Sequence, residues 1–137
     1  MKKLIFIMAL ILLAGLTFGQ SLQKGNLIGT HVMTVNLKPG VTMEQFIEFF
    51  KNKALPEWNK VEPDWKMYIV KSIRGDLKNS FGMIHVVKSE KIRDKYNNDD
   101  GSSTELGKSV SEKLKPVWDE LEKLGTFTTT YTDWVVQ

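Results

Sequence analysis

The 137-residue sequence contains no cysteine. Disulfide bonds are therefore excluded, and so are a cysteine nucleophile and a lipid attached through a processed cysteine. A chain of this length buries about 65% of its unfolded surface when it folds. The absence of cross-links thus predicts one domain that depends on its hydrophobic core for stability.

The sequence also lacks any long block of charge of one sign. Lysine and arginine number 19 against 16 acids, and two of those lysines are Lys2 and Lys3 near the start of the chain. Without these two, the net charge falls from +3 to about +1. A nearly balanced surface predicts neither nucleic acid nor an anionic membrane as a partner.

Several chemical motifs are missing as well. The sequence has no phosphate-binding glycine loop and no serine nucleophile elbow. The acidic segment at 97–101 superficially resembles a calcium loop, but with Gly101 in sixth place the first and twelfth positions fall on Tyr96 and Gly107, where acids are required. The only histidines are His31 and His85, whereas zinc prefers three or four protein ligands. We therefore expect no metal site.

The N-terminus has the three-part order of a secretory signal peptide. Lys2 and Lys3 precede an apolar stretch over 4–16, and small residues follow at Thr17 and Gly19. This stretch is shorter than the roughly 20 residues of a membrane-spanning helix. We expect residues 1–19 to be removed, leaving 20–137 as an exported domain in the periplasm or outside the cell, with no membrane attachment.

The rest of the chain alternates between patterns typical of strands and of helices. β-Branched and aromatic residues predict strands, whereas capping residues followed by apolar side chains three and four positions apart predict helices. Pro56 should end or kink the first helix, and Gly125 should stop the last one in a left-handed conformation. The predicted order is a strand at 27–37, a helix from 43, strands at 66–74 and 81–88, a short helix at 90–96, a long helix from 104 and a strand at 126–136.

This βαββαβ order predicts a ferredoxin-like α+β fold. The first and third strands should be central in a four-stranded antiparallel sheet, with the helices on one face only. We expect the other face to carry Met33, Phe81, Met83, His31 and His85 and to be buried in a homodimer, because a monomer rarely exposes a large apolar patch.

On these elements the sequence resembles the dimeric α+β barrel superfamily, which includes antibiotic-biosynthesis-type monooxygenases and NIPSNAP-like proteins. The resemblance rests on Lys38-Pro39-Gly40 before a phenylalanine-rich helix and on Ser89-Glu90 before a short helix that carries Arg93, Asp94 and Tyr96. It implies two subunits that press their sheets together, with a pocket in or beside the barrel. In the monooxygenase branch a histidine often lines that pocket, and Tyr96 stands at the corresponding place here.

The candidate ligand-binding residues are histidines, aromatic residues and one methionine. If the strand centres align, residues whose numbers sum to about 116 lie opposite each other, which would pair His31 with His85. Two imidazoles in an apolar pocket could act as acid and base or contact haem, whereas buried histidines that only stabilise a strand are also common. The full candidate set is His31, Met33, Trp58, Trp65, His85 and Tyr96.

Two functions remain open from the sequence. The first is a binding protein for a small apolar molecule, with no cofactor and no assigned catalytic residues. The second, implied by the resemblance, is a cofactor-independent monooxygenase or a haem-handling enzyme that uses His31, His85 and Tyr96. A structural partner in a cell-surface complex is a third possibility.

We expect export to remove residues 1–19. N-terminal sequencing of the protein recovered from its own cells should then begin at Gln20. A mature protein that still begins with Met1, or one found in the membrane pellet, would contradict the cleavage.

Overall fold

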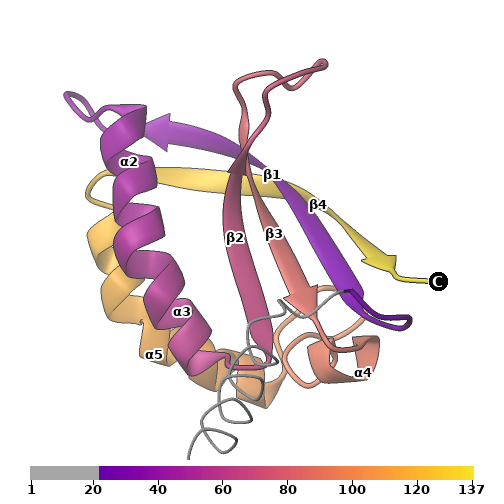
Figure 1. Cartoon of the computed structure of the whole chain (residues 1–137). Helices are drawn as coiled ribbons and strands as arrows, with labels where there is room; N and C mark the ends of the chain where they lie inside the picture. Colours follow the sequence, from indigo (N-terminus) through magenta and orange to yellow (C-terminus); the bar gives the residue numbers. More distant parts are fainter. Residues whose placement is uncertain (1–21) are drawn as a thin grey trace, which may run out of the picture.

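The computed structural model describes residues 22–137, so the expected signal peptide lies outside the described residues. Four strands form one antiparallel sheet in the order β2-β3-β1-β4, which confirms that the first and third strands are central (Figure 1). The strands are β1 (Leu27–Leu37), β2 (Trp65–Lys71), β3 (Phe81–Val87) and β4 (Gly125–Val135). The helical segments are α2 (Met43–Phe49), the π-helical turn η1 (Phe50–Ala54), α3 (Leu55–Val61), α4 (Glu90–Arg93) and α5 (Glu105–Leu121).

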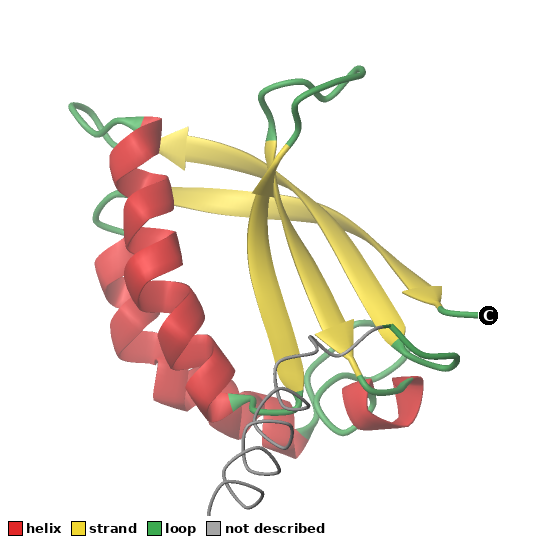
Figure 2. Ribbon diagram, viewed as in Figure 1, coloured by secondary structure: helices red, strands yellow, loops and turns green. Residues whose placement is uncertain are grey.

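The long helical segments lie on one side of the sheet and leave the other side open (Figure 2). The chain thus has a ferredoxin-like α+β fold, as the order of its elements predicted. Within residues 22–137 we find no helix long and apolar enough to cross a membrane.

The hydrophobic core lies between the sheet and the helices. Phe46 and Phe50 are fully buried, and their rings pack edge-on against Phe127 of β4. Leu114 and Leu121 on α5 are buried as well. The apolar spacing read from the sequence therefore marks the faces that pack together in both helical segments.

The face assignment made from the sequence is wrong. Met33, Met83 and His85 are buried beneath the helices, with exposed fractions of 6, 3 and 5%. Alternation alone divides a strand into two sets of residues, but it does not say which set faces the helices when both contain apolar residues. The face that stays open carries Ile28, Thr30, Val32 and Thr34 of β1, Tyr68 and Val70 of β2, Gly82, Ile84 and Val86 of β3, and Thr128, Thr130, Thr132 and Trp134 of β4.

The strand register also differs from the expectation. His31 lies opposite Met83, and His85 lies opposite Gly29, so partner numbers sum to 114 and not 116. A shift of this size keeps both histidines on the same face, because side chains alternate with a period of two. The two rings are therefore diagonal neighbours.

Pro56 does not end the first helical segment. The π-helical turn η1 precedes it, in which the backbone N–H of Leu55 bonds to the carbonyl of Phe50, and α3 then begins with Pro56 in its first turn. In the first turn of a helix the missing N–H of proline costs no intrahelical bond. Trp58 is consequently held on a helix, where no regular structure was expected.

The long helix begins as predicted and ends differently. Thr104 caps α5 by accepting a hydrogen bond from the backbone of Gly107, and Pro116 lies on the exposed side. Leu106 follows the apolar spacing of α5 but is 47% exposed. Gly125 is not in the left-handed conformation. It starts β4, where a side chain would collide with the carbonyl of Asn36 at 2.7 Å.

Candidate functional site

A cavity of about 300 Å³ opens between the helix-facing side of the sheet and the segments α3, α4 and α5. We call it the site cavity. Its walls combine contributions from strands, helices and the loop at 97–103, so that residues far apart in the sequence meet there. The rings that line it are His31, Trp58, Trp65, His85, Tyr96, Trp118 and Tyr131.

Gly29 of β1 creates the space in which the two histidines meet. A Cβ at this position would lie 3.5 Å from Nε2 of His31, 3.6 Å from Cβ of His85 and 3.0 Å from Oδ1 of Asp133. Because glycine leaves this volume free, the ring of His31 stacks on that of His85, with centroids 4.4 Å apart and planes 23° apart. Polar side chains from β1, β3 and β4 therefore surround the backbone of Gly29.

His85 is the most enclosed polar side chain at the site. Its ring packs against Trp65 and Trp58, with centroids 5.3 and 6.0 Å away. Among the described residues, neither Nε2 of His85 nor Nε1 of Trp65 has a hydrogen-bond partner. Burial, and secondarily the neighbouring His31, lowers the pKa of His85 from 6.5 to about 3. His85 is therefore uncharged near neutral pH.

His31 links the buried part of the cavity to its mouth. Its Nδ1 lies 3.4 Å from Oγ1 of Thr129, and the other face of its ring stacks on exposed Tyr131 at 5.4 Å. Burial lowers its pKa, although the charge of Asp133 acts in the opposite direction. The histidines and Tyr131 form a row of three stacked rings across β3, β1 and β4.

Glu62 is a buried carboxyl group beside the cavity, with an exposed fraction of 5%. It follows Trp58 by one helical turn and accepts a hydrogen bond from Nε1 of that tryptophan. Burial raises the pKa of Glu62, and the hydrogen bond from Trp58 opposes this change in part. The bond also fixes the indole of Trp58, which lies edge-on to Trp118 at 5.3 Å.

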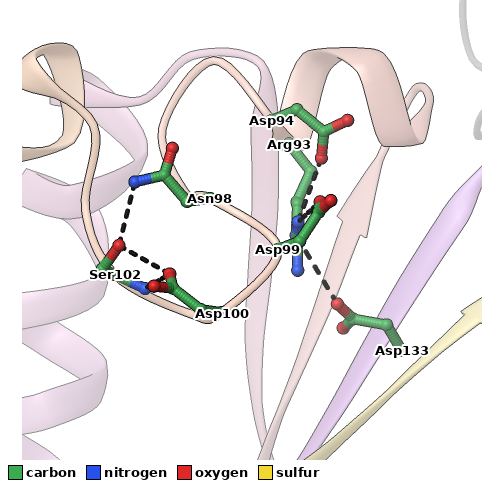
Figure 3. A network of polar contacts seen from close by, with 7 residues as sticks. All are labelled: Arg93, Asp94, Asn98, Asp99, Asp100, Ser102 and Asp133. Atoms are coloured by element: carbon green, nitrogen blue, oxygen red, sulfur yellow. Dashed lines mark hydrogen bonds and ion pairs between the residues drawn. The ribbon is translucent and has the colours of Figure 1, made fainter.

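Arg93 lines the cavity and contacts three carboxylates from different segments (Figure 3). Its guanidinium lies 3.0 Å from Asp94 next to it, 3.8 Å from Asp99 in the 97–103 loop and 3.7 Å from Asp133 on β4. We call these four residues the arginine cluster. The side chains of Arg93 and Asp133 are only 15 and 28% exposed, so their contact is less screened than a surface ion pair, whereas Asp94 and Asp99 are exposed.

Tyr96 is positioned by the start of α5. Its carbonyl accepts a hydrogen bond of 3.0 Å from the backbone N–H of Thr104. A side chain at Gly107 would collide with the same carbonyl. This close approach holds Tyr96 edge-on to Trp65, with centroids 5.9 Å apart.

Five of the six residues proposed from the sequence line the site cavity: His31, His85, Tyr96, Trp58 and Trp65. Met33 does not, because it is buried in the core further along β1. The sequence analysis missed Glu62, Arg93, Trp118, Tyr131 and Asp133 as cavity residues.

Some of these residues left a signal in the sequence. Glu62 follows Trp58 at the spacing of one helical turn, and Asp133 alternates with Tyr131 on one side of a strand. Arg93 left no such signal, since its role depends on three segments that meet only in the folded chain.

A second cavity of about 440 Å³ adjoins the first and shares His31, Trp58, His85 and Trp118 with it. We call it the adjoining chamber. Its other walls include Met83, Leu121 and Phe127. The site cavity is the more polar, and the adjoining chamber the more apolar, of two neighbouring cavities that share these four side chains.

The two histidines are not placed to bind one haem iron between them. The rings of His31 and His85 stack face to face, so their nitrogens cannot bind one iron from opposite sides. Among residues 22–137 no group of three or more histidines and acids could hold a metal ion.

Comparisons with known proteins give only distant structural similarities. No protein-family model matches the chain, and no curated protein matches it. Solved structures with a similar fold include SnoaB, a cofactor-independent oxygenase from Streptomyces nogalater, at 14% identity over 82% of this chain and 94% of that chain, with a TM-score of 0.47. At3g17210 from Arabidopsis thaliana is similar at 14% identity over 80% and 95% of the two chains, with a TM-score of 0.40. Similarities of this size say nothing about ligand or activity.

The buried histidine should make the protein sensitive to acid. A pKa of about 3 in the folded state and 6.5 in the unfolded state means that the contribution of His85 is fully present above pH 6.5 and is lost as pH falls toward 3. Between pH 7 and pH 4 the free energy of unfolding should decrease by about 3 kcal/mol through this group. His85→Phe should remove most of that decrease in urea titrations at each pH.

The half-buried His31 provides the matched comparison. His31→Phe should reduce the pH dependence less, because its ring is nearer to solvent and to Asp133. If the His85→Phe protein loses stability with falling pH as steeply as the wild type, the neutral state assigned to His85 is wrong.

Proposed function

We propose that the protein binds a small, largely apolar organic molecule in the site cavity. The observation that supports this proposal is the cavity itself, which is about 300 Å³ in volume, walled by aromatic rings and next to the adjoining chamber. Cavities of about 300–1,000 Å³ with apolar walls and a few placed polar groups are typical of ligand sites.

The packing of the rings supports binding over a purely structural role. A core histidine that only stabilises its strand normally has its hydrogen bonds satisfied, yet Nε2 of His85 has no partner among the described residues. His31, Trp58 and Trp118 also face open volume on two sides, since they line both cavities. Aromatic rings that line a cavity favour a flat or elongated ligand.

We also propose that the protein is a homodimer. The open face of the sheet carries exposed Tyr68 and Trp134, at 51 and 59%, beside half-buried Ile28, Val32 and Ile84. No described helix covers this face (Figure 2). A two-fold contact would remove the same apolar patch from water on both subunits. Export to the periplasm or beyond the cell is part of the same proposal, on the basis of the N-terminal signal.

The enzymatic alternative from the sequence, a cofactor-independent monooxygenase, stays a prediction. In its favour, two uncharged imidazoles lie against the cavity, and a neutral imidazole can accept a proton from a bound phenol or carbon acid. We assign no residue to the steps of the reaction that would follow this proton transfer.

Filling the space above Gly29 should abolish binding. Gly29→Val places a branched side chain against Asp133 and His31, whereas Thr34→Val adds the same side chain on the open face of the same strand. With 4-phenylbutan-1-ol as the probe, calorimetry should show binding to the wild type and to Thr34→Val, and none to Gly29→Val. Equal binding to all three proteins would place the ligand elsewhere.

A charge at the centre of the open face should split the dimer. Ile84 lies on a central strand between Thr30 and Tyr68, so Ile84→Glu would bury two carboxylates in the proposed contact. The variant should sediment as a monomer at micromolar concentration, while the wild type and Lys51→Glu, altered on an exposed helical position, remain dimers. Met33→Glu is unsuitable for this test, because Met33 is buried in the core. A monomeric wild type would refute the dimer.

A further inference from the structure

We propose that the ligand of the site cavity is an organic amine, bound as a cation with its apolar skeleton in the adjoining chamber. This inference rests on the proposed function and names the class of molecule bound at the same site. It follows from three properties of the cavity: its hydrogen-bonding groups, its charge and the apolar chamber beside it.

Two carboxylates are the charged acceptors of the cavity. Glu62 and Asp133 contribute carboxylate oxygens to its lining. In the tautomer of His31 that donates from Nδ1 to Thr129, Nε2 is an acceptor as well. On the donor side, Nε1 of Trp58 is already bonded to Glu62, whereas Nε1 of Trp65 has no partner among the described residues. A positively charged donor on the ligand would therefore find carboxylate partners at the site.

The charge around the cavity also disfavours an anion. Among the residues lining the cavity, Arg93 is the one base with a permanent charge, and it is shared among Asp94, Asp99 and Asp133. Three carboxylates around one guanidinium leave a net negative charge there (Figure 3). A carboxylate or phosphate on the ligand would be repelled here, whereas an ammonium group would be attracted.

Two of the acceptors converge above Gly29. Oδ1 of Asp133 and Nε2 of His31 lie 3.0 and 3.5 Å from the position that a Cβ of residue 29 would take. The ion pair of Asp133 with Arg93 uses its other oxygen, Oδ2. Both acceptors line the site cavity beside Gly29, and an ammonium group in the cavity between them could donate to each of them.

The aromatic walls suit a cation in the same place. Trp58, Trp65, Tyr96 and Tyr131 line the cavity, and the negative faces of such rings attract an ammonium group within about 6 Å. Beyond the histidines, the adjoining chamber offers Met83, Leu121 and Phe127 to an apolar chain. A primary amine carried on an aryl-alkyl skeleton therefore matches both cavities.

Three probes with one skeleton and different head groups test the inference: 4-phenylbutylamine, 4-phenylbutan-1-ol and 4-phenylbutyrate. Calorimetry on the wild-type protein at neutral pH should show the amine binding about tenfold tighter than the alcohol, with the acid the weakest. Asp133→Asn should bring the amine close to the alcohol while the affinity for the alcohol changes little. Glu62→Gln provides a second variant that lowers the preference for the amine, should Asp133→Asn not fold.

Glu44→Gln is the matched control, because it removes one carboxylate from an exposed position of α2 far from the cavity. Its amine-to-alcohol ratio should equal that of the wild type. If the alcohol binds as tightly as the amine, or if the foldable cavity variants keep the full preference, the amine assignment is wrong and the proposed binding function stands. If none of the three probes binds, the proposed function fails together with it.

Discussion

The geometry of the site depends on the absence of a side chain at Gly29. Gly29 leaves a gap in the middle of the helix-facing side of the sheet, and the stacked pair His31 and His85, together with Asp133, closes around it. A Cβ at this position would press on Oδ1 of Asp133 and touch both histidines, and a larger side chain would take up more of the same space. The position of the histidines, the neutral state that burial imposes on them and the convergence of the acceptors all follow from this one constraint on β1.

The fold could be predicted from the sequence because its signals are local. The capping box at Thr42 and Gln45, the cap at Thr104 and the alternation along the strands each depend on residues only a few positions apart. Their order then leaves few possible topologies. The buried face of the sheet was predicted wrongly because both faces carry apolar residues and the local pattern does not distinguish them. The effect of Pro56 was predicted wrongly because the π-helical turn before it allows the helical segment to continue.

The candidate site could be predicted in part. Because histidine and tryptophan are rare residue types, most of the aromatic residues in the cavity wall could be selected from the sequence. Both histidines lie on the same face of the sheet whether partner numbers sum to 116 or to 114. The charged residues were missed because surface and cavity acids look alike in a sequence. Asp133 lies near the end of the chain, about a hundred positions from Gly29, and only the pairing of β1 with β4 brings the two together.

The arginine cluster makes one part of the cavity wall sensitive to salt. α4, the 97–103 loop and β4 are joined by Arg93 through charge attraction, with a bridge between Asn97 and Ser103 as the loop's own backbone pairing. Attraction between partly hydrated charges weakens as salt accumulates around them, whereas the apolar packing deeper between sheet and helices is strengthened by many salts. The charged wall and the apolar interior therefore respond in opposite directions to the ionic strength of the surroundings.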